Sequence, residues 1–413
     1  MGRSGPTRWR LLIAAGVVLA AAAVVAPVRW SVSAHATSST GSTYVPAAAP
    51  ARVLDTRAAG QTRLPVDGTL TLQVPGVPVG ATAVVLNVTA VAPTAGGFLT
   101  VYPHGTSRPS TSNVDFSPNQ TTANLVMVPA ANGSVDIFSA HSSTDVVVDF
   151  EGYYEPATGS SDTFTPLQTP GRILDTRSGL GIPGAKGPLG PNSQLVLQVS
   201  SPSAGIPDNA AAVVLNLTAT GPTDASYLTA YATGTTRPAT SNVNFGPGQS
   251  VANLTVVPVS HGQITIWNNV GTTDVVADIF GYYTQGAGST FTTVTPMRVL
   301  NTLDGTGTNG VAPLGESTVN VPVASVLGAP PNITAVLLHV AVVNPTADSF
   351  LTIYPSGPAQ PDTSNINFSP GQIISNSAIV PVGSDGKITF WNHHGAVDIV
   401  ADVSGYFTAP PSS

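Results

Sequence analysis

Apolar and polar residues alternate in short stretches along most of this chain. In residues 84–91 one alternate set is wholly apolar, and the set between includes Asn87 and Thr89. A period of two places successive side chains on opposite faces of a β-strand. The stretch therefore predicts a strand with one face toward a core. The core-facing residues would be Val84, Leu86, Val88 and Ala90.

The same reasoning predicts eight strands in the first third of the chain. They cover residues 51–56, 69–74, 83–91, 98–102, 113–116, 123–128, 134–138 and 145–153. Turn-forming pairs rich in Gly, Pro and Asn separate them, and no helical period is apparent after residue 36. Short strands at this spacing predict an all-β fold of antiparallel sheets, either sandwich-like or barrel-like.

Three ordered motifs occur three times each. R-V-L-D-T-R at 52–57 returns as R-I-L-D-T-R at 172–177 and R-V-L-N-T-L at 298–303. T-S-N-x-[DN]-F follows at 111–116, 240–245 and 363–368, and D-x-x-G-Y-[YF] closes each block at 149–154, 278–283 and 402–407. We therefore predict three tandem β repeats, at 44–156, 163–285 and 291–408, after a linker at 37–43. Whether they pack together or stay separate is left open.

Residues 1–36 have the layout of an export signal. Arg3, Arg8 and Arg10 precede an apolar run, and Ala34 and Ala36 form an A-x-A cleavage site. The alternative is an uncleaved anchor helix, with membrane contact only through residues 11–28. Either reading predicts that the repeats are secreted or lie on the extracellular face of the cell envelope.

Charge and cysteine content exclude several classes of function. All 21 acidic residues lie after position 36, whereas four of the 14 basic residues lie before it. An acidic chain disfavours a nucleic-acid partner, since that needs a basic patch. With no cysteine, disulfides, thiolate metal sites and cysteine nucleophiles are excluded.

Recurrent charged residues predict structural ion pairs. Asp149, Asp278 and Asp402 end very apolar strands, where a carboxylate needs a partner. The arginines recurring in every repeat are Arg52, Arg172 and Arg298, so we predict an Arg–Asp pair joining the first and last strands. The alternative is a cation site shared with an Asp four positions earlier, at Asp145, Asp274 and Asp398. We expect no metal and no cofactor.

A second pair is predicted in repeats one and two only, Asp55 with Arg57 and Asp175 with Arg177. In repeat three both charges are lost together, at Asn301 and Leu303. The joint loss is expected of residues that neutralise each other. It would equally fit a ligand contact missing from that repeat.

Aromatic residues give the clearest binding hypothesis. Several alternate with core residues, which predicts that they lie on the less apolar face: Trp267, Trp391, Phe138, Tyr102, Tyr231 and Tyr354. Rings beside Thr and Asn could stack on a sugar. The alternative is that they cover the core edge or pack between repeats.

The set of motifs resembles a repeat of secreted actinobacterial proteins, where it occurs in tandem or beside exported hydrolases. The resemblance covers residues 50–408 and implies no catalytic residue and no particular ligand. None of the seven histidines recurs in every repeat, and the chain has no G-x-S-x-G, no H-E-x-x-H and no phosphate-binding glycine loop. A pair of acids for glycoside cleavage is left open.

These observations predict an exported structural or adhesive protein without catalytic activity. The alternatives are a protein that binds cell-wall or environmental glycan, and an unrecognised hydrolase. The expected partners are cell-wall glycan or another surface protein.

Overall fold

The computed structural model describes residues 41–410, except 159–160, 183, 185, 203–204, 287 and 309. The described residues belong to one compact unit. The predicted export signal at 1–36, including the anchor at 11–28, lies outside the described residues. Within the described part the all-β prediction is confirmed, because strands dominate and all paired strands are antiparallel.

Each repeat contributes eight strands. Copy 1 contains β1 (Ser42–Asp55), β2 (Thr69–Gln73), β3 (Ala83–Val91), β4 (Gly97–Pro103), β5 (Val114–Phe116), β6 (Thr122–Pro129), β7 (Ser134–Ala140) and β8 (Asp145–Pro156). Copy 2 contains β9 (Asp162–Asp175), β10 (Ser193–Gln198), β11 (Ala212–Thr220), β12 (Ser226–Ala232), β13 (Val243–Phe245), β14 (Val251–Pro258), β15 (Gln263–Asn268) and β16 (Asp274–Gln285). Copy 3 contains β17 (Thr290–Asn301), β18 (Thr318–Val321), β19 (Ile333–Val343), β20 (Ser349–Pro355), β21 (Ile366–Phe368), β22 (Ile374–Pro381), β23 (Ile388–Asn392) and β24 (Asp398–Thr408).

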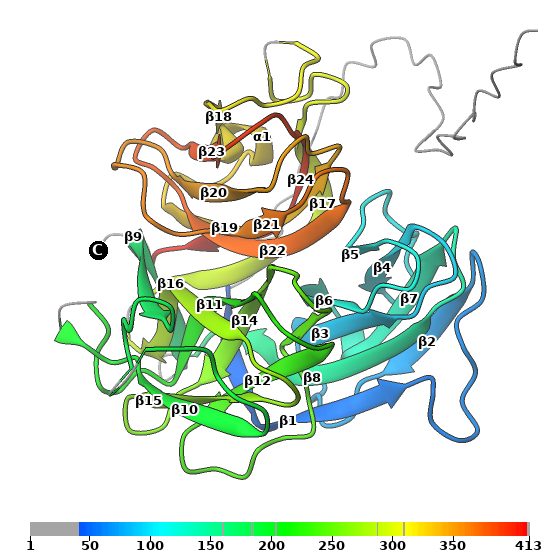
Figure 1. Ribbon diagram of the computed structural model, residues 1–413. Helices are drawn as coiled ribbons and strands as arrows, with labels where there is room; N and C mark the ends of the chain where they lie inside the picture. Colours follow the sequence, from blue (N-terminus) through cyan, green and yellow to red (C-terminus); the bar gives the residue numbers. More distant parts are fainter. Residues whose placement is uncertain are drawn as a thin grey trace, which may run out of the picture. The chain divides into compact units, whose positions relative to one another are not determined.

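In every copy the strands form two sheets with the same order. The inner sheet of copy 1 runs β1-β8-β3-β6 and its outer sheet runs β2-β7-β4-β5. A short contact between β1 and β17 joins the inner sheets of copies 1 and 3. The sheets that the described residues form are open, so the copies are sandwich-like rather than barrel-like. Figure 1 shows the three sandwiches in blue to cyan, green, and yellow to red.

The predicted and observed strands differ mainly at β1. This strand begins at Ser42 rather than at residue 51, and its pairing with β8 shifts register between Pro46 and Ala51. The intervening P-A-A-A-P has no alternation to reveal a strand. One short helix was also missed, α1 (Val323–Leu327), which Gly328 ends in the left-handed conformation. Five residues are too few to show a helical period.

Each copy buries its own core between its two sheets. In copy 1 the predicted core set on β3 contacts Leu99 of β4 and Ile137 of β7 across this layer. Equivalent cores lie in copies 2 and 3. The opposite face of β3 is buried as well, because Val85 belongs to a fourth core that all three copies share. Alternation therefore marked one core correctly and gave no sign of the other.

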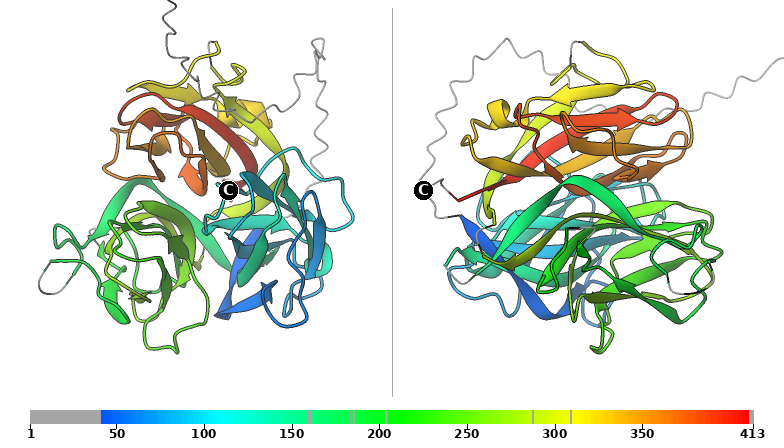
Figure 2. Two further views of the ribbon diagram at one scale, coloured as in Figure 1. Left: turned by 45° about the vertical axis from the view of Figure 1, so that its right-hand side comes forward. Right: turned by 90° about the vertical axis from the view of Figure 1, so that its left-hand side faces the viewer.

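Six aromatic rings form a closed cycle in this shared core. Neighbouring ring centroids lie 4.6–5.5 Å apart, a range typical of favourable aromatic pairs. The first strand and the last strand of each copy supply one ring each. In order around the cycle they are Tyr44, Tyr154, Phe291, Phe407, Phe164 and Tyr283. The left view of Figure 2 shows the copies around a common centre.

The cycle explains the glycine of the D-x-x-G-Y-[YF] motif. A Cβ atom at Gly152 would lie 2.7 Å from the Tyr44 ring, and one at Gly281 would lie 2.5 Å from the Phe164 ring. At Gly405 the Phe291 ring would be 2.4 Å away. The motif therefore needs glycine because an aromatic ring of the same copy packs directly on the last strand.

We predict that Leu86→Asp unfolds copy 1. Loss of a buried Leu side chain costs roughly 2–5 kcal/mol, and an unpaired buried carboxylate adds to this cost. Leu86 is fully buried in the core of copy 1. Chemical denaturation should show a loss of more than about 3 kcal/mol, whereas Val66→Asp, at an exposed site, should change little. Coincident curves for Leu86→Asp and wild type would refute the assignment of this core.

Candidate functional site: the interfaces between copies

The recurrent Asp of the closing motif joins one copy to the next. Asp149 accepts hydrogen bonds from Arg52 Nε at 2.9 Å and Nη2 at 3.2 Å, across β1 and β8. Its Oδ2 also accepts the backbone N–H of Ser241, in the T-S-N motif of copy 2, at 3.1 Å. The predicted Arg–Asp pair is thus present, and it has a third partner that the sequence did not reveal.

The same arrangement links copy 2 to copy 3. Arg172 Nε lies 2.9 Å from Asp278 Oδ1, and Ser364 N donates to Asp278 Oδ2 at 2.9 Å. In copy 3, Arg298 Nε donates to Asp402 Oδ1 at 2.7 Å. All three predicted pairs therefore connect the first and last strands of their own copies.

Burial has an electrostatic cost at these carboxylates. Desolvation raises the pKa of Asp149 and of Asp278, although the arginine hydrogen bonds and the serine N–H act in the opposite direction. A buried ion pair is weak evidence for net stability, but loss of one partner is expensive because it leaves a buried charge. These pairs therefore specify how the strands and copies meet more than they stabilise them.

Asparagine side chains extend the contact between copies. Asn87 Nδ2 donates to the carbonyl of Ser241, while Asn253 Nδ2 donates to Asn87 Oδ1 at 2.8 Å. Asn253 Oδ1 accepts the backbone N–H of Leu125 at 3.1 Å. Asn216 and Asn376 repeat these contacts between copies 2 and 3. Because both partners are buried, each amide must be paired.

The interface between copies 3 and 1 uses different side chains. His339 occupies the position of Asn87 and Asn216, and its Nε2 lies 3.2 Å from Asp115 Oδ2. Ser375 Oγ accepts from Asn124 Nδ2 at 3.0 Å, and Ser377 Oγ donates to the Leu125 carbonyl at 2.6 Å. This third interface is therefore a variant of the other two. Aligning the three repeats would have identified His339.

The second predicted pairs are present at the edges of two interfaces. Arg57 contacts Asp55 with two hydrogen bonds of 2.8 and 2.7 Å, and Arg177 contacts Asp175 in the same way. The arginine hydrogen bonds lower the pKa of both carboxyls. In copy 3, Asn301 Nδ2 instead donates to Asp304 at 2.6 Å.

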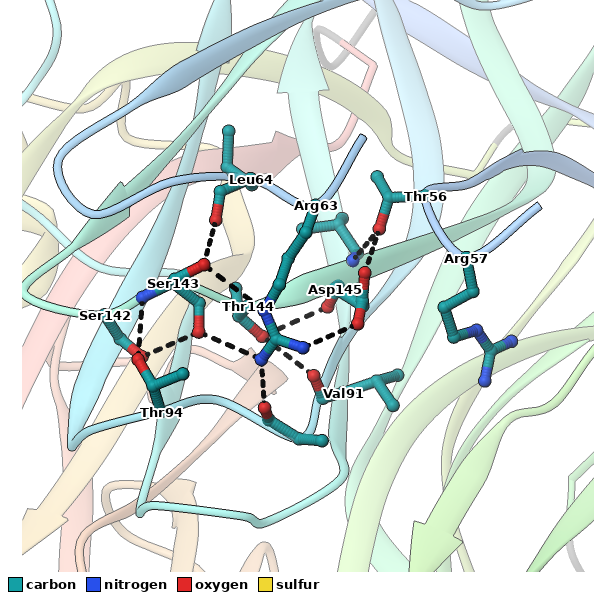
Figure 3. A network of polar contacts seen from close by, with 12 residues as sticks. Thr56, Arg57, Arg63, Leu64, Val91, Thr94, Ser142, Ser143, Thr144 and Asp145 are labelled. Carbon is teal, nitrogen blue, oxygen red and sulfur yellow. Dashed lines mark hydrogen bonds and ion pairs between the residues drawn. The ribbon is translucent and has the colours of Figure 1, made fainter. Parts of the chain in front are cut away.

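The alternative of a cation site at Asp145 conflicts with its surroundings. Thr56 Oγ1 donates to Asp145 Oδ1 at 3.0 Å, and Arg63 Nη1 contacts Oδ2 at 2.8 Å. Figure 3 shows Arg63 reaching across this network, with Arg57 apart from it. Thr176 and Thr302 donate to the equivalent Asp274 and Asp398. No cluster of three metal-ligating residues occurs among the residues that the structure describes.

The aromatic residues predicted to bind sugar are mostly covered. Trp267 is 6% exposed, and the Arg237 guanidinium carbon lies 3.5 Å from its ring centroid. Arg108 covers Phe138 in the same way at 3.8 Å. Tyr102, Tyr231 and Tyr354 are also buried. Sequence reasoning missed these arginines, although R-P-x-T-S-N occurs in two repeats and would have drawn attention to them.

Trp391 differs from Trp267 and Phe138, the aromatic residues at the matching positions of copies 2 and 1. It is only partly buried, and its ring contacts Phe350 and His393 at centroid distances of 5.7 and 5.1 Å. Gln360 stands in the motif position of Arg108 and Arg237. The hypothesis of stacking on a sugar therefore remains a prediction, with Trp391 the most accessible of the three rings.

A small pocket lies between copies 1 and 2. Its volume is about 150 Å³, and its walls include Arg52, Arg57 and Thr89 from copy 1, and Tyr227 and Asn244 from copy 2. A larger hollow of about 510 Å³ lies beside α1, lined by small and apolar residues with no charged side chain. The first pocket thus brings together charged guanidinium groups, a hydroxyl group, a side-chain amide and an aromatic ring.

Glu151 is a further residue that sequence reasoning missed. It is 2% exposed at the position of Phe280 and Ser404, and its Oε1 has no hydrogen-bond partner. Burial, and secondarily the charge of Asp149, raises the pKa of its carboxyl from 4.5 to about 8. Comparison of the repeats could have identified an acidic residue at an otherwise apolar position.

No described helix is long and apolar enough to span a membrane.

We predict that Glu151 makes stability fall as pH rises. The folded protein holds its proton up to about pH 8, whereas the unfolded chain releases it near pH 4.5. The group's contribution is therefore complete below pH 4.5 and is lost as pH rises through 8. Glu151→Gln should raise the free energy of unfolding at pH 8 by at least about 1 kcal/mol and change it little at pH 5.

Urea denaturation at the two pH values measures this difference. The matched control is Glu155→Gln, at a partly exposed residue on the same strand, which should show no such dependence. An effect of Glu151→Gln that is equal at both pH values would contradict a buried, protonated carboxyl.

No family model and no curated protein matches this chain. Among solved structures, one similar chain comes from the Sulfolobus turreted icosahedral virus. The alignment covers 90% of the present protein and 91% of the viral chain, with 8% sequence identity and a TM-score of 0.19. A second similar chain belongs to an archaeal virus and has a triple jelly roll fold. The alignment covers 89% of the present protein and 90% of that chain, with 9% sequence identity and a TM-score of 0.18. The tandem CBM22 domain of Paenibacillus barcinonensis Xyn10C covers 59%, with 94% of that chain covered (12% identity, TM-score 0.18). At such TM-scores these likenesses carry no argument.

Proposed function

We propose that this protein is an exported structural or adhesive module that acts outside the cell without catalysing a reaction. The observation that supports it most is the use of the recurrent polar residues. Asp149 and Asp278 are each occupied by an arginine and by a backbone N–H of the next copy. The recurrent Asp of repeats one and two thus helps to hold neighbouring copies together.

Export rests on the leader at residues 1–36, which has the pattern of a secretory signal. A protein outside the cell meets proteases and solvent conditions that select for a well-packed unit. Three separate cores and one shared core supply that packing without any cysteine. The partners we propose are cell-wall glycan or another surface protein.

Binding of glycan is the second candidate function. The pocket between copies 1 and 2 favours it, because hydrogen-bonding groups and an aromatic ring meet there in a concave site. The partly buried Trp391 would be a further contact. A hydrolase is the third and weakest candidate, because the sequence contains neither G-x-S-x-G nor H-E-x-x-H.

We predict that the full chain, expressed with residues 1–36 in a bacterium, is digested by protease added to intact cells. The purified protein should also be retained on insoluble cell-wall material in a pull-down. Chromogenic ester and glycoside substrates should show no turnover above buffer. A chain protected inside intact cells would contradict export, and steady turnover of any substrate would contradict a non-catalytic role.

A separate variant tests whether the rings of Trp267 and Trp391 contact glycan. Combined Trp267→Ala and Trp391→Ala should weaken retention if these rings stack on glycan. Unchanged retention in the double variant would exclude the rings as the contact while leaving adhesion intact.

A further inference from the structure

A polar pocket lies at the interface between copies 1 and 2, and the same kinds of residue recur at the matching positions between copies 2 and 3. At the first, Arg57 and Thr89 of copy 1 face Tyr227 and Asn244 of copy 2. The same motif positions at the second interface hold Arg177, Thr218, Phe350 and Asn367. The flanking links through Ser241 and Ser364 are matched within 0.2 Å, at 3.1 and 2.9 Å.

Both interfaces contain buried polar atoms without a hydrogen-bond partner. Thr89 Oγ1 is one such atom at the first interface, and its equivalent Thr218 Oγ1 is another at the second, where Asn367 Nδ2 is also unpaired. The third interface has unpaired atoms of a different kind, Asn124 Oδ1 and His339 Nδ1. Buried polar groups are nearly always paired, so an unpaired one calls for an explanation such as a missing ligand or water. Thr89 Oγ1 and Thr218 Oγ1 are the same hydroxyl in two copies, which argues against an accident of one site.

The third interface lacks the arginine, its aspartate and the threonine. Leu303 replaces Arg57, Asn301 replaces Asp55, and Ala341 replaces Thr89. The Arg298–Asp402 pair, which has a structural role, is nevertheless kept. The joint loss fits a ligand contact missing from that interface, and it also fits the loss of an ion pair whose members neutralise each other. It indicates that the fold does not require Arg57, Asp55 and Thr89.

The chemistry of the walls selects a neutral ligand rich in hydroxyl groups. Each arginine is already neutralised by a carboxylate, Arg52 by Asp149 and Arg57 by Asp55. An anion would compete with these carboxylates, whereas a neutral molecule would not. A guanidinium has five N–H donors, and the pair with Asp55 uses two of them on Arg57.

Donors and acceptors stand side by side in this pocket. The guanidinium groups line it together with the Thr89 hydroxyl and the Asn244 amide, and the Tyr227 ring provides an apolar face. A sugar hydroxyl both donates and accepts, and a sugar ring has an apolar face that packs on an aromatic ring. The volume of about 150 Å³ is below the roughly 300–1,000 Å³ of sites for drug-sized ligands, so it suits one sugar unit.

We propose that each of these two interfaces binds one neutral sugar residue, with Arg57 and Thr89 in the first pocket and Arg177 and Thr218 in the second. This inference deepens the proposed adhesive function, on which it rests for the source of the ligand. The end of a neutral glycan chain would enter between two copies. The third interface binds none.

Calorimetric titration of the full chain with neutral methyl glycosides tests the proposal. The panel consists of the methyl glycosides of glucose, galactose, mannose, arabinose and N-acetylglucosamine, with methyl glucuronide as the anionic comparison. At least one neutral member should bind with a Kd below about 1 mM and a stoichiometry of two per chain. Arg57→Leu and Arg177→Leu should each reduce the stoichiometry to one, and the double variant should bind none.

Each of these substitutions introduces the residue that copy 3 carries at Leu303, but it leaves Asp55 or Asp175 without its arginine, so a thermal melt by circular dichroism checks that folding is kept. Thr89→Ala with Thr218→Ala, which reproduces the alanine that copy 3 has at Ala341, is a second pair of variants and should weaken binding at least tenfold. The matched control is Arg108→Leu, which removes an arginine over Phe138 and should leave two sites.

Three results would overturn the pocket assignment: no neutral glycoside binding, two sites in the double arginine variant, or tighter binding of the glucuronide. Retention on cell-wall material separates this failure from that of the proposed function. If the double variant is retained as well as wild type, adhesion stands and the pockets fail. If wild type binds two glycosides but is not retained, the pockets stand and adhesion to the cell wall fails.

Discussion

A buried carboxylate shared between two copies is the contact on which this architecture depends. Asp149 and Asp278 each receive an arginine from their own first strand and a backbone N–H from the following copy. A carboxylate without these donors would be untenable there. One side chain thus couples the closure of an inner sheet to the docking of the next sandwich. The R-V-L-D-T-R, D-x-x-G-Y-[YF] and T-S-N motifs meet at this point at the interfaces between copies 1 and 2 and between copies 2 and 3.

The shared core adds the apolar part of the same coupling. The aromatic cycle needs two rings from each copy, and the glycine of the closing motif makes room for one of them. Each ring has one neighbouring ring from its own copy and one from another copy. Packing of the three copies is therefore part of folding, which lets a chain without cysteine build a large unit. The third interface shows that this plan tolerates substitution, since His339 and Ser377 replace the amide contacts there.

Much of the fold could be predicted from the sequence, and most of the interface could not. Alternation located all eight strands of copy 1, and recurrence paired Arg52 with Asp149. Alternation defines two faces of a strand but not what covers the second face. Asn87 and Thr89 therefore gave a polar face that in fact packs against copy 2. The partner of Asp149 there is a backbone N–H, which no side-chain pattern reveals, and the cover over Trp267 comes from a loop arginine.

The central claim is that the three repeats fold as one unit, and calorimetric unfolding of the full chain tests it most directly. The shared carboxylates and the aromatic cycle predict a single transition whose calorimetric enthalpy equals its van't Hoff enthalpy. Three resolved transitions, or a calorimetric enthalpy about three times the van't Hoff value, would show that the copies fold independently and would contradict the account.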